Sequence, residues 1–283
     1  MSHAPRAEWS TLRHDAELRL DALQASFKTY AFARHWHDYY VIGLVEAGAQ
    51  SFWCRNATYT TPPGGLITLN PGDPHTGQAA VAAGFAYRAL YPTRDHMTRA
   101  MGEFGRPNQL PRFPAFRIDD PELAEAVRAL QHAIGSGLPP IERESRWLAL
   151  LTTLIRRHGA DHLSLPVAGA EPRAVASVRA YIEAHYAERV TLAALAAEVG
   201  LSPFHLVRVF QRATGMPPHV YLESVRIRQA QRLLAGAQPL VDVAYATGFS
   251  SQSHFTSRFR QIIGVTPGVF RSMHAPPRSA ARL

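Results

Sequence analysis

The chain has 283 residues, of which 46% are hydrophobic and 18% are charged, so a disordered polypeptide is excluded and one large or two ordinary domains can form. It contains no run of about 18 apolar residues, its first ten residues lack the apolar core of a signal peptide, and its single cysteine, Cys54, cannot form an internal disulfide. We therefore expect a cytoplasmic protein with no membrane partner.

The net charge of +8 is unevenly distributed along the chain. Residues 1–171 contain 17 basic and 17 acidic residues, whereas residues 172–283 contain 13 arginines and only 5 acidic residues. A neutral first part followed by a basic second part is typical of a module that binds a polyanion, joined to a domain of another kind.

The first part combines a β-rich segment with two helices. From about residue 32 to residue 92, short runs rich in Val, Ile, Tyr and Thr are broken by Gly and Pro, which predicts a sandwich or small barrel. Between about 120 and 158, apolar residues recur at helical spacing, in one set of Leu123, Val127, Leu130 and Ile134 and a second of Leu148, Leu151, Leu154 and Ile155. The two helices either cover their own barrel or pair with a second copy, and the pattern leaves both possibilities open.

Residues 163–172 contain Pro, Gly and small residues without any period, which predicts a linker. We therefore divide the chain into an N-terminal domain over 1–162, a linker over 163–172 and a helical C-terminal domain over 173–283. The fold class is a two-domain α+β protein, with a β-barrel and flanking helices followed by an all-α domain.

The C-terminal domain contains an internal repeat. Leu192, Ala196 and Gly200 match Leu240, Ala244 and Gly248 at an offset of 48, and after one inserted residue the offset becomes 49. The matches at the new offset pair His205 with His254, Phe210 with Phe259, Gly215 with Gly264 and Pro218 with Pro267. So many matches at a nearly constant offset indicate a duplication.

Each copy has the pattern of a helix-turn-helix unit, at about 191–214 and 240–263. In the first copy Thr191 is a suitable N-cap, Gly200 permits the left-handed turn, and Ser202 caps the second helix. The buried face of that second helix is predicted to contain Leu206, Val209, Phe210 and Ala213. The buried face of the matching helix in the second copy is predicted to contain Phe255, Phe259 and Ile262. A long helix from about 220 to 235 is expected to hold the two units apart, so that they reach successive major-groove segments about 34–36 Å apart.

The outward residues of each second helix are candidates for reading base edges in the major groove. They are Pro203, Phe204, Val207, Arg208 and Gln211 in the first copy, and Gln252, Ser253, Thr256 and Ser257 in the second. Arg208 can bond guanine through two N–H groups, and glutamine suits adenine. The candidates for phosphate contacts, which position a protein without reading sequence, are Arg212, Arg258 and Arg260. A plain helical bundle with a basic surface is the alternative interpretation of the repeat.

Residues 172–272 closely resemble the AraC/XylS family of bacterial transcription regulators. The resemblance is carried by Val243-Ala244, Gly248-Phe249, Ser253-His254-Phe255, Phe259, Gly264-Val265-Thr266-Pro267 and Phe270-Arg271, and by Arg226-Ile227, Ala230 and Leu233-Leu234 of the long helix. It implies binding to double-stranded promoter DNA and contact with RNA polymerase, usually to activate transcription. The departure in this chain is the apolar set Pro203, Phe204 and Val207 around Arg208, so target bases cannot be carried over from relatives.

The N-terminal part is similar to the cupin-like, arabinose-binding-type sensory domain of that family. The similarity rests on Arg34-His35-Trp36-His37-Asp38, Glu46-Ala47-Gly48, Pro63-Gly64-Gly65 and Asn70-Pro71-Gly72-Asp73-Pro74-His75. We expect an effector pocket formed by His35, His37, Tyr39, Trp53, His75 and Tyr91, because residues two apart on a strand share a face. The resemblance implies an organic effector and no other cofactor, with this domain also a candidate for forming a homodimer.

A metal site formed by His35, His37 and His75 is the alternative interpretation of the same residues. Glu46 lies on the opposite strand face unless a bulge intervenes, which weakens a four-ligand site. The competing functions are therefore a regulator controlled by a small molecule, a metal-dependent cupin enzyme or metal sensor fused to a DNA-binding domain, and a non-specific architectural DNA protein. We expect the regulator and no enzymatic activity, because the sequence shows no catalytic triad, P-loop or GxGxxG motif.

Overall fold

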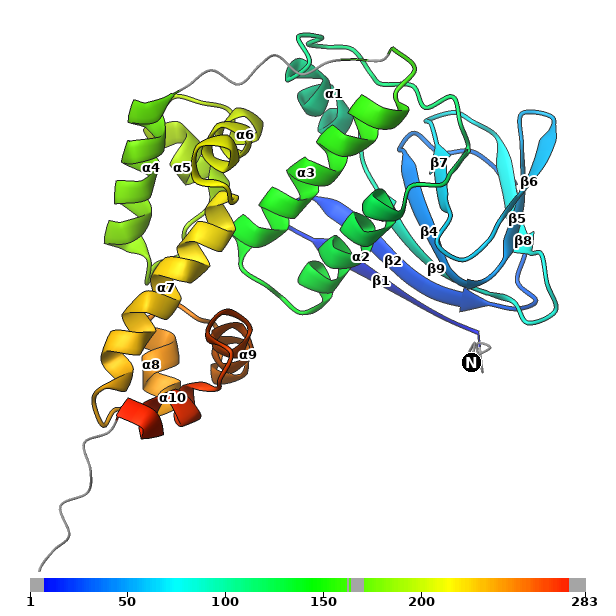
Figure 1. Ribbon diagram of the computed structural model, residues 1–283. Coiled ribbons are helices and arrows are strands. Elements are labelled where there is room, and N and C mark those ends of the chain that lie inside the picture. Colours follow the sequence, from blue (N-terminus) through cyan, green and yellow to red (C-terminus); the bar gives the residue numbers. More distant parts are fainter. Residues whose placement is uncertain (1–7, 162, 164–170, 275–283) are drawn as a thin grey trace, which may run out of the picture. The chain divides into compact units, whose positions relative to one another are not determined.

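The computed structural model describes residues 8–161, 163 and 171–274 (Figure 1). They belong to two compact units, one formed by Met1–Leu138 with Arg146–Val167 and the other by Pro139–Ser145 with Ala168–Leu283. Most of the linker predicted at 163–172 lies outside the described residues.

The N-terminal unit is built from two antiparallel sheets. The larger has the strand order β1-β2-β9-β4-β7-β10 and the smaller the order β3-β8-β5-β6. The strands are β1 (Trp9–Asp15), β2 (Leu20–Phe27), β3 (Phe32–His35), β4 (Val41–Gly48), β5 (Gln50–Cys54), β6 (Ala57–Thr61), β7 (Leu66–Leu69), β8 (His75–Ala79), β9 (Phe85–Tyr91) and β10 (Arg117–Ile118). The β-rich prediction is confirmed, but it began at residue 32 and therefore missed β1 and β2.

Both sheets contribute to one core. Val45, Ile67 and Phe85 of the larger sheet pack in the same buried cluster as Phe52 and Cys54 of the smaller sheet. Alternating side chains of each strand point to this core, which is why short runs of Val, Ile and aromatic residues fold into two facing layers.

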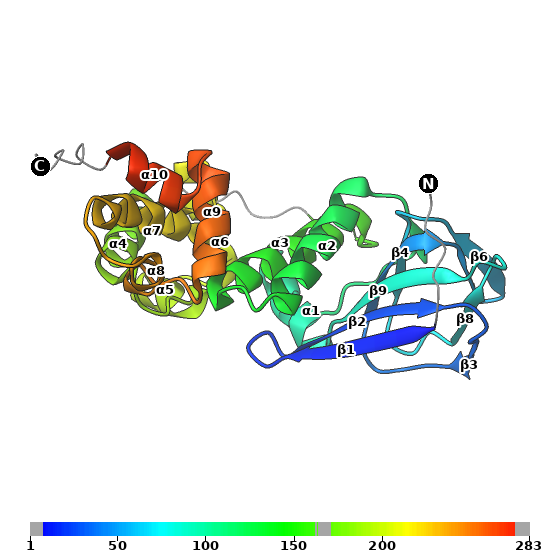
Figure 2. The same cartoon turned by 90° about the horizontal axis from the view of Figure 1, so that it is seen from below.

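Helix α1 (Arg94–Gly102) follows β9 in the sequence, and α2 (Pro121–Gly135) and α3 (Pro140–His158) follow β10. Asp120 starts α2 by accepting a hydrogen bond from the Leu123 amide at 3.0 Å. Gln131 of α2 donates to the carbonyl oxygens of Leu23 and Ala89, at 3.2 and 2.8 Å, which fixes α2 along the larger sheet (Figure 2). The two helices predicted between 120 and 158 are thus confirmed, and α1 was not predicted.

The C-terminal unit is helical. Its elements are α4 (Pro172–His185), α5 (Leu192–Glu198), α6 (Pro203–Thr214), α7 (Pro218–Leu234), α8 (Leu240–Ala246), α9 (Gln252–Ile263) and α10 (Pro267–His274). Within the described ranges no single helix is long and apolar enough to cross a membrane, and one bent pair, α5 with α6, passes that test by length and composition only.

The two helix-turn-helix units are α5 with α6 and α8 with α9. Thr191 and Ser202 accept capping hydrogen bonds from Ala194 and His205, at 3.2 and 3.0 Å, and α5 meets α6 at 82°. Gly200 and Gly248 adopt φ of 66° and 82°, the left-handed conformation predicted for the turns. The long helix predicted between the units is α7 (Figure 1). Two side chains assigned to the core are exceptions, because Ala213 and Ile262 are exposed.

Arg226 of α7 fixes the second unit against the end of α4. Its side chain is 4% exposed and donates from Nε to the Tyr186 carbonyl at 2.7 Å and from Nη2 to the Glu188 carbonyl at 2.9 Å. These bonds tie the arginine to carbonyl groups that follow α4, so this buried arginine is structural and does not contribute to the basic surface.

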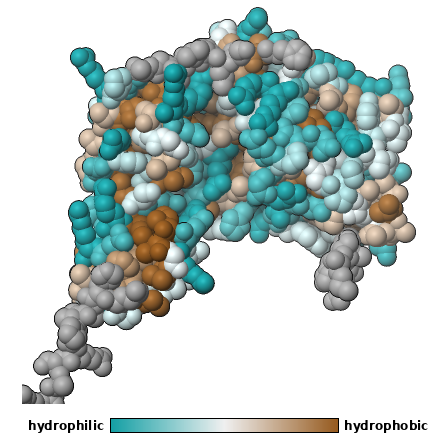
Figure 3. All heavy atoms as spheres, viewed as in Figure 1, coloured by the Kyte–Doolittle hydropathy of each residue, from teal (hydrophilic) through white to brown (hydrophobic). Residues whose placement is uncertain are grey.

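The exposed large apolar side chains of this unit are Val241, Tyr245, Ile262 and Val269, which lie on α8, α9 and α10. Figure 3 shows brown atoms gathered in the lower half of the C-terminal unit, while most of the viewed surface is hydrophilic.

Candidate functional sites

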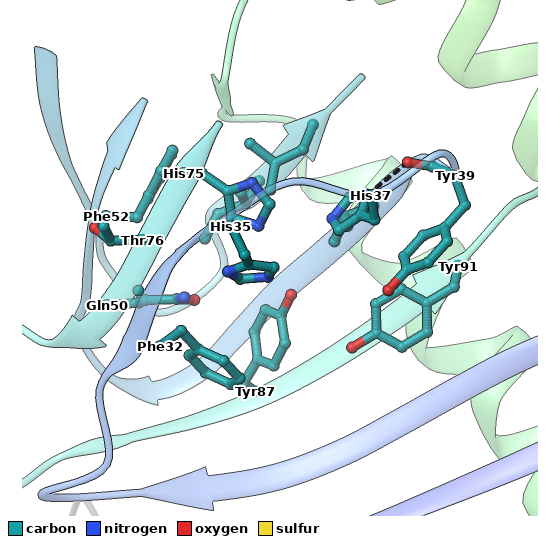
Figure 4. A pocket seen from close by; sticks show the side chains of 14 residues that line it. Phe32, His35, His37, Tyr39, Gln50, Phe52, His75, Thr76, Tyr87 and Tyr91 are labelled. Atoms are coloured by element: carbon teal, nitrogen blue, oxygen red, sulfur yellow. Dashed lines mark hydrogen bonds between the residues drawn. The ribbon is translucent and has the colours of Figure 1, made fainter. Parts of the chain in front are cut away.

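A cavity of about 160 Å³ lies between the two sheets of the N-terminal unit (Figure 4). Its walls combine imidazoles, tyrosines, one amide and aliphatic groups. The lining residues are Phe32, His35, His37, Tyr39, Val41, Gln50, Phe52, Ile67, Leu69, His75, Thr76, Gly77, Tyr87 and Tyr91. Five of the six residues predicted for an effector pocket are therefore brought together by the fold.

Trp53 is the exception, because it does not line the cavity and its predicted place in the pocket is wrong. Successive residues of β5 point to opposite faces, so Gln50 and Phe52 line the cavity while Trp53 does not. The guanidinium of Arg34 lies over the Trp53 ring, 4.0 Å from its centroid. The same alternation could have indicated Gln50, which the sequence analysis missed.

Three histidines from three chain segments meet at one side of the cavity. His35 ends β3 and faces His75, the first residue of β8, in the strand register, with ring centroids 4.4 Å apart. His37 lies in the loop after β3, not on a strand as predicted, and its ring centroid is 4.9 Å from that of His75. The ligand atoms that these histidines offer all lie within 4.8 Å of one another.

All three imidazoles are oriented in the same way by backbone carbonyl groups. The Nδ1 atoms of His35, His37 and His75 lie 2.8, 2.8 and 2.9 Å from the carbonyl oxygens of Ala33, Tyr39 and Asp73. Because a carbonyl oxygen only accepts hydrogen bonds, each Nδ1 carries the proton and each Nε2 presents a lone pair.

Burial keeps two of these rings neutral. Burial, together with smaller contributions from the neighbouring imidazoles of His35 and His37, lowers the pKa of His75 to about 4. Burial also lowers the pKa of His37. At neutral pH these rings are therefore available as acceptors and not as cations.

Tyrosine side chains also line the cavity. The ring of Tyr87 lies against Gly43 of β4. A Cβ added to this glycine would be 2.6 Å from Cε2 of the tyrosine, so the glycine provides the space for the ring. Burial raises the pKa of Tyr87 and Tyr91 well above the usual range, so both hydroxyls stay protonated and can donate a hydrogen bond. The sequence analysis missed Tyr87.

Gln50 presents an unsatisfied oxygen to this cavity. The residue is 7% exposed, and its Oε1 atom is buried without a hydrogen-bond partner among the described residues. A buried acceptor of this kind costs free energy unless a donor reaches it, which a bound molecule can supply.

Glu46 takes no part in the cavity. Its carboxylate accepts from Nε of Arg88 at 2.6 Å and from Nε of Arg128 at 2.9 Å, so it is held on the other side of β4. This agrees with the opposite strand face predicted for it.

The second recognition helix, α9, presents its polar residues on one hollowed surface. The four residues predicted to read bases, Gln252, Ser253, Thr256 and Ser257, line this hollow together with Arg260, Gln261, Gly264 and Thr266. The opposite face of α9 is buried through Phe255 and Phe259. The helix therefore has one apolar face fixed in the core and one polar face toward solvent.

The first recognition helix, α6, differs from the prediction at Val207. This residue is 6% exposed, so its predicted outward position is wrong. Arg208 is half-buried, with Nη2 placed 3.1 Å from Nδ1 of His205, and Pro203 and Phe204 are half-buried as well. Gln211 and Arg212 are exposed as expected.

Arg258 requires a second correction, because it is not placed for a phosphate contact. Its Nη2 donates to Oε1 of Glu142 at 2.6 Å, and its Nε lies 2.9 Å from Oε1 of Glu223. The arginine side chain is 16% exposed and the two glutamate side chains are 2% and 12% exposed. The guanidinium is thus used inside the C-terminal unit to neutralise buried carboxylates.

A β domain with a polar cavity, followed in the chain by two capped helix-turn-helix units, defines a ligand-binding, DNA-binding protein of the regulator class. Comparison with known proteins supports this class. The family model of an AraC-like ligand binding domain matches residues 17–151, and that of a helix-turn-helix domain matches residues 195–273.

Relatives match over most of the chain. An uncharacterized HTH-type transcriptional regulator of Bacillus subtilis, YbfI, is 35% identical over 247 residues, which cover 87% of this chain and 90% of the relative. The HTH-type transcriptional activator RhaS of Klebsiella pneumoniae is 25% identical over 256 residues, with coverage of 87% and 90%. The solved DNA-binding domain of AdpA, in complex with a target DNA, matches 35% of this chain and 91% of its own at 32% identity and a TM-score of 0.34.

The chain belongs to the AraC family of helix-turn-helix transcriptional regulators. It is a DNA-binding transcription regulator with an N-terminal ligand-binding domain. Its relatives are transcriptional regulators, and this favours the regulator function over the enzyme alternative.

Proposed function

We propose that the cavity between the two sheets is the effector site and that its occupation controls DNA binding and transcription. The observation that carries this proposal is the lining itself, with neutral imidazoles, protonated tyrosines and the unsatisfied Gln50 oxygen around about 160 Å³. A cavity of about 150 Å³ accepts a molecule of the size of benzene. The effector is therefore a small polar molecule that donates at least one hydrogen bond to Gln50.

DNA recognition is assigned to the exposed residues of the two recognition helices. On α9 these are Gln252, Ser253 and Ser257, together with the half-buried Thr256, whose amide and hydroxyl groups suit base edges in the major groove. On α6 the exposed Gln211 is the clearest candidate, and Arg208 reads guanine after its side chain leaves His205. Arg212 and Arg260 are exposed cations suited to phosphate contacts.

We further propose that the protein activates transcription, by analogy with its relatives, the HTH-type transcriptional activators RhaS. Activation implies contact with RNA polymerase at a promoter in the cytoplasm. Binding as a homodimer would place two pairs of recognition helices on the DNA and increase specificity by linking the binding events.

A thermal-shift screen of the full chain with small polar compounds tests the effector site. A compound that occupies the cavity raises the melting temperature by binding the folded state. Gln50→Ala removes the acceptor and is expected to lower the affinity for that compound five- to tenfold, which corresponds to about 1 kcal/mol of binding free energy. Gln78→Ala, at an exposed position of β8, is the matched control and leaves the affinity unchanged.

The same compound must also change the affinity of the full chain for its DNA site. Equal compound affinity in Gln50→Ala and wild type would refute the location of the site, and unchanged DNA affinity would refute the control mechanism.

A further inference from the structure

The three histidines of the cavity share one orientation, in which Nδ1 is hydrogen-bonded to a backbone carbonyl group and Nε2 is left for another partner. Each Nε2 presents a lone pair, and no described residue forms a hydrogen bond with any of these three atoms. The ligand atoms that the three histidines offer lie within 4.8 Å of one another, so that one ion can contact all three rings. A metal cation is the simplest group that accepts all three at once.

The hydrogen bonds from Nδ1 are those that orient metal-binding histidines. A metal-ligating imidazole almost always donates its other N–H to a carbonyl or carboxylate group, which fixes the tautomer and the ring plane. Here the partners are the main-chain oxygens of Ala33, Tyr39 and Asp73, so the orientation depends on the backbone and not on mobile side chains.

The rest of the fold is consistent with this arrangement. His35 and His75 are placed opposite each other by the pairing of β3 with β8, and His37 reaches the same point from the loop. The ring of Tyr39 stacks on that of His37 with centroids 4.1 Å apart and an interplanar angle of 5°, which restricts the His37 ring. Figure 4 shows the three imidazoles close together at the cavity, with Tyr39 beside His37.

We propose that His35, His37 and His75 bind a divalent transition-metal ion through their three Nε2 atoms. Three imidazoles without a carboxylate suit Zn²⁺, Co²⁺, Ni²⁺ or Cu²⁺ better than Mg²⁺ or Ca²⁺, which prefer oxygen. Glu46, the acidic residue of the cupin-like motif, is not a fourth ligand, because Arg88 and Arg128 hold it elsewhere.

A site with three protein ligands leaves coordination positions open toward the cavity. Tyr87 and Gln50 line the same cavity, so an oxygen-donor effector can bind the ion while it forms hydrogen bonds with these residues. This second part, an ion that anchors the effector, rests on the function proposed above. The ion-binding part rests on the histidine geometry alone.

The test uses the untagged full chain, stripped with a chelator and titrated with Co²⁺ while visible absorption is recorded. We expect one Co²⁺ per chain, with d–d bands of a nitrogen-ligated ion, and displacement of it by Zn²⁺. His35→Gln removes one ligand at an exposed position and is expected to lower the affinity at least about 100-fold, since even residues that only orient ligands contribute 10- to 100-fold.

His14→Gln is the matched control, because His14 is exposed and pairs with Asp21 on the far strands of the larger sheet. It leaves Co²⁺ affinity unchanged. Thermal melting of each metal-free variant verifies folding, and a triple variant with glutamine at 35, 37 and 75 loses the absorption bands altogether. Absence of Co²⁺ binding in the wild type, or equal binding in wild type and His35→Gln, would overturn the proposed site.

Acetate added to the Co²⁺ form tests the open position. A shift of the d–d bands is expected as the carboxylate enters, and an unchanged spectrum would overturn the anchoring of an oxygen-donor effector. Because none of these measurements involves DNA or the effector, their failure leaves the regulator function standing, and failure of effector control leaves the metal site standing.

Discussion

Gly248 shows how a single residue fixes the second helix-turn-helix unit. Its φ is 82°, and an added Cβ would lie 2.8 Å from the Tyr186 carbonyl oxygen, 2.9 Å from that of Ala187 and 2.9 Å from Nη2 of Arg226. The backbone oxygens cannot move away cheaply. The glycine therefore permits both the left-handed turn and the close approach of the segment after α4.

Gly248→Ala is expected to destabilise the C-terminal unit by about 2–4 kcal/mol, combining left-handed strain with overlap. Gly264→Ala is the matched control, because Gly264 has φ of 91° but open space around it, so only about 1 kcal/mol of strain is expected. Urea denaturation of the full chain, followed by a probe in this unit, measures both. Equal losses for the two variants would contradict the role given to the contact.

At the scale of the element, α9 separates two arginines with different functions. Arg258 faces inward between Glu142 and Glu223, whereas Arg260 lies on the exposed hollow. The helical period of 3.6 residues places positions two apart on different faces. The two arginines cannot be distinguished from the local sequence, because the buried carboxylates Glu142 and Glu223 come from α3 and α7, far away in the chain.

Arg258→Ala is expected to destabilise the protein by about 2–4 kcal/mol, because it leaves carboxylates buried without their cation. Arg260→Ala is expected to leave stability within about 0.5 kcal/mol, to weaken binding to all DNA sequences and to reduce the salt dependence by about one counterion. Denaturation and DNA titrations at several salt concentrations separate the two effects. A stability loss for Arg260→Ala, with none for Arg258→Ala, would reverse the assignment.

Several elements could be predicted because their signals are local. The duplication, the capping residues Thr191 and Ser202 and the turn glycines fix the helix-turn-helix units from sequence alone. Strand β1 was missed because it is largely exposed and polar, so it lacks the apolar alternation of a half-buried strand. Strand β2 was missed although its first buried residues, Leu20 and Ala22, do alternate with half-buried ones. Val207 was predicted to face outward from the helical spacing of the apolar residues of α6. The buried face of this helix is wider than that spacing suggested and includes Val207.

At the scale of the whole molecule, the cavity depends on contacts that no local pattern contains. Predicting His35, His37 and His75 required the motif resemblance, since one comes from a strand, one from a loop and one from a distant strand. Tyr87 became evident only when strand pairing was known, whereas the alternation along β5 could have indicated Gln50. The charge asymmetry, in contrast, is visible directly, because 13 arginines and 5 acidic residues lie in residues 172–283.

The most direct test of the central claim is selection of binding sites by the full chain from a random duplex DNA library at a fixed salt concentration. Two enriched blocks are predicted, with centres about one helical turn apart. Gln252→Ala is expected to relax the preference within one block, and Gln211→Ala within the other, by about 1–3 kcal/mol. Binding without any enriched sequence, or two variants that relax the same block, would contradict a regulator that reads DNA with two separate helices.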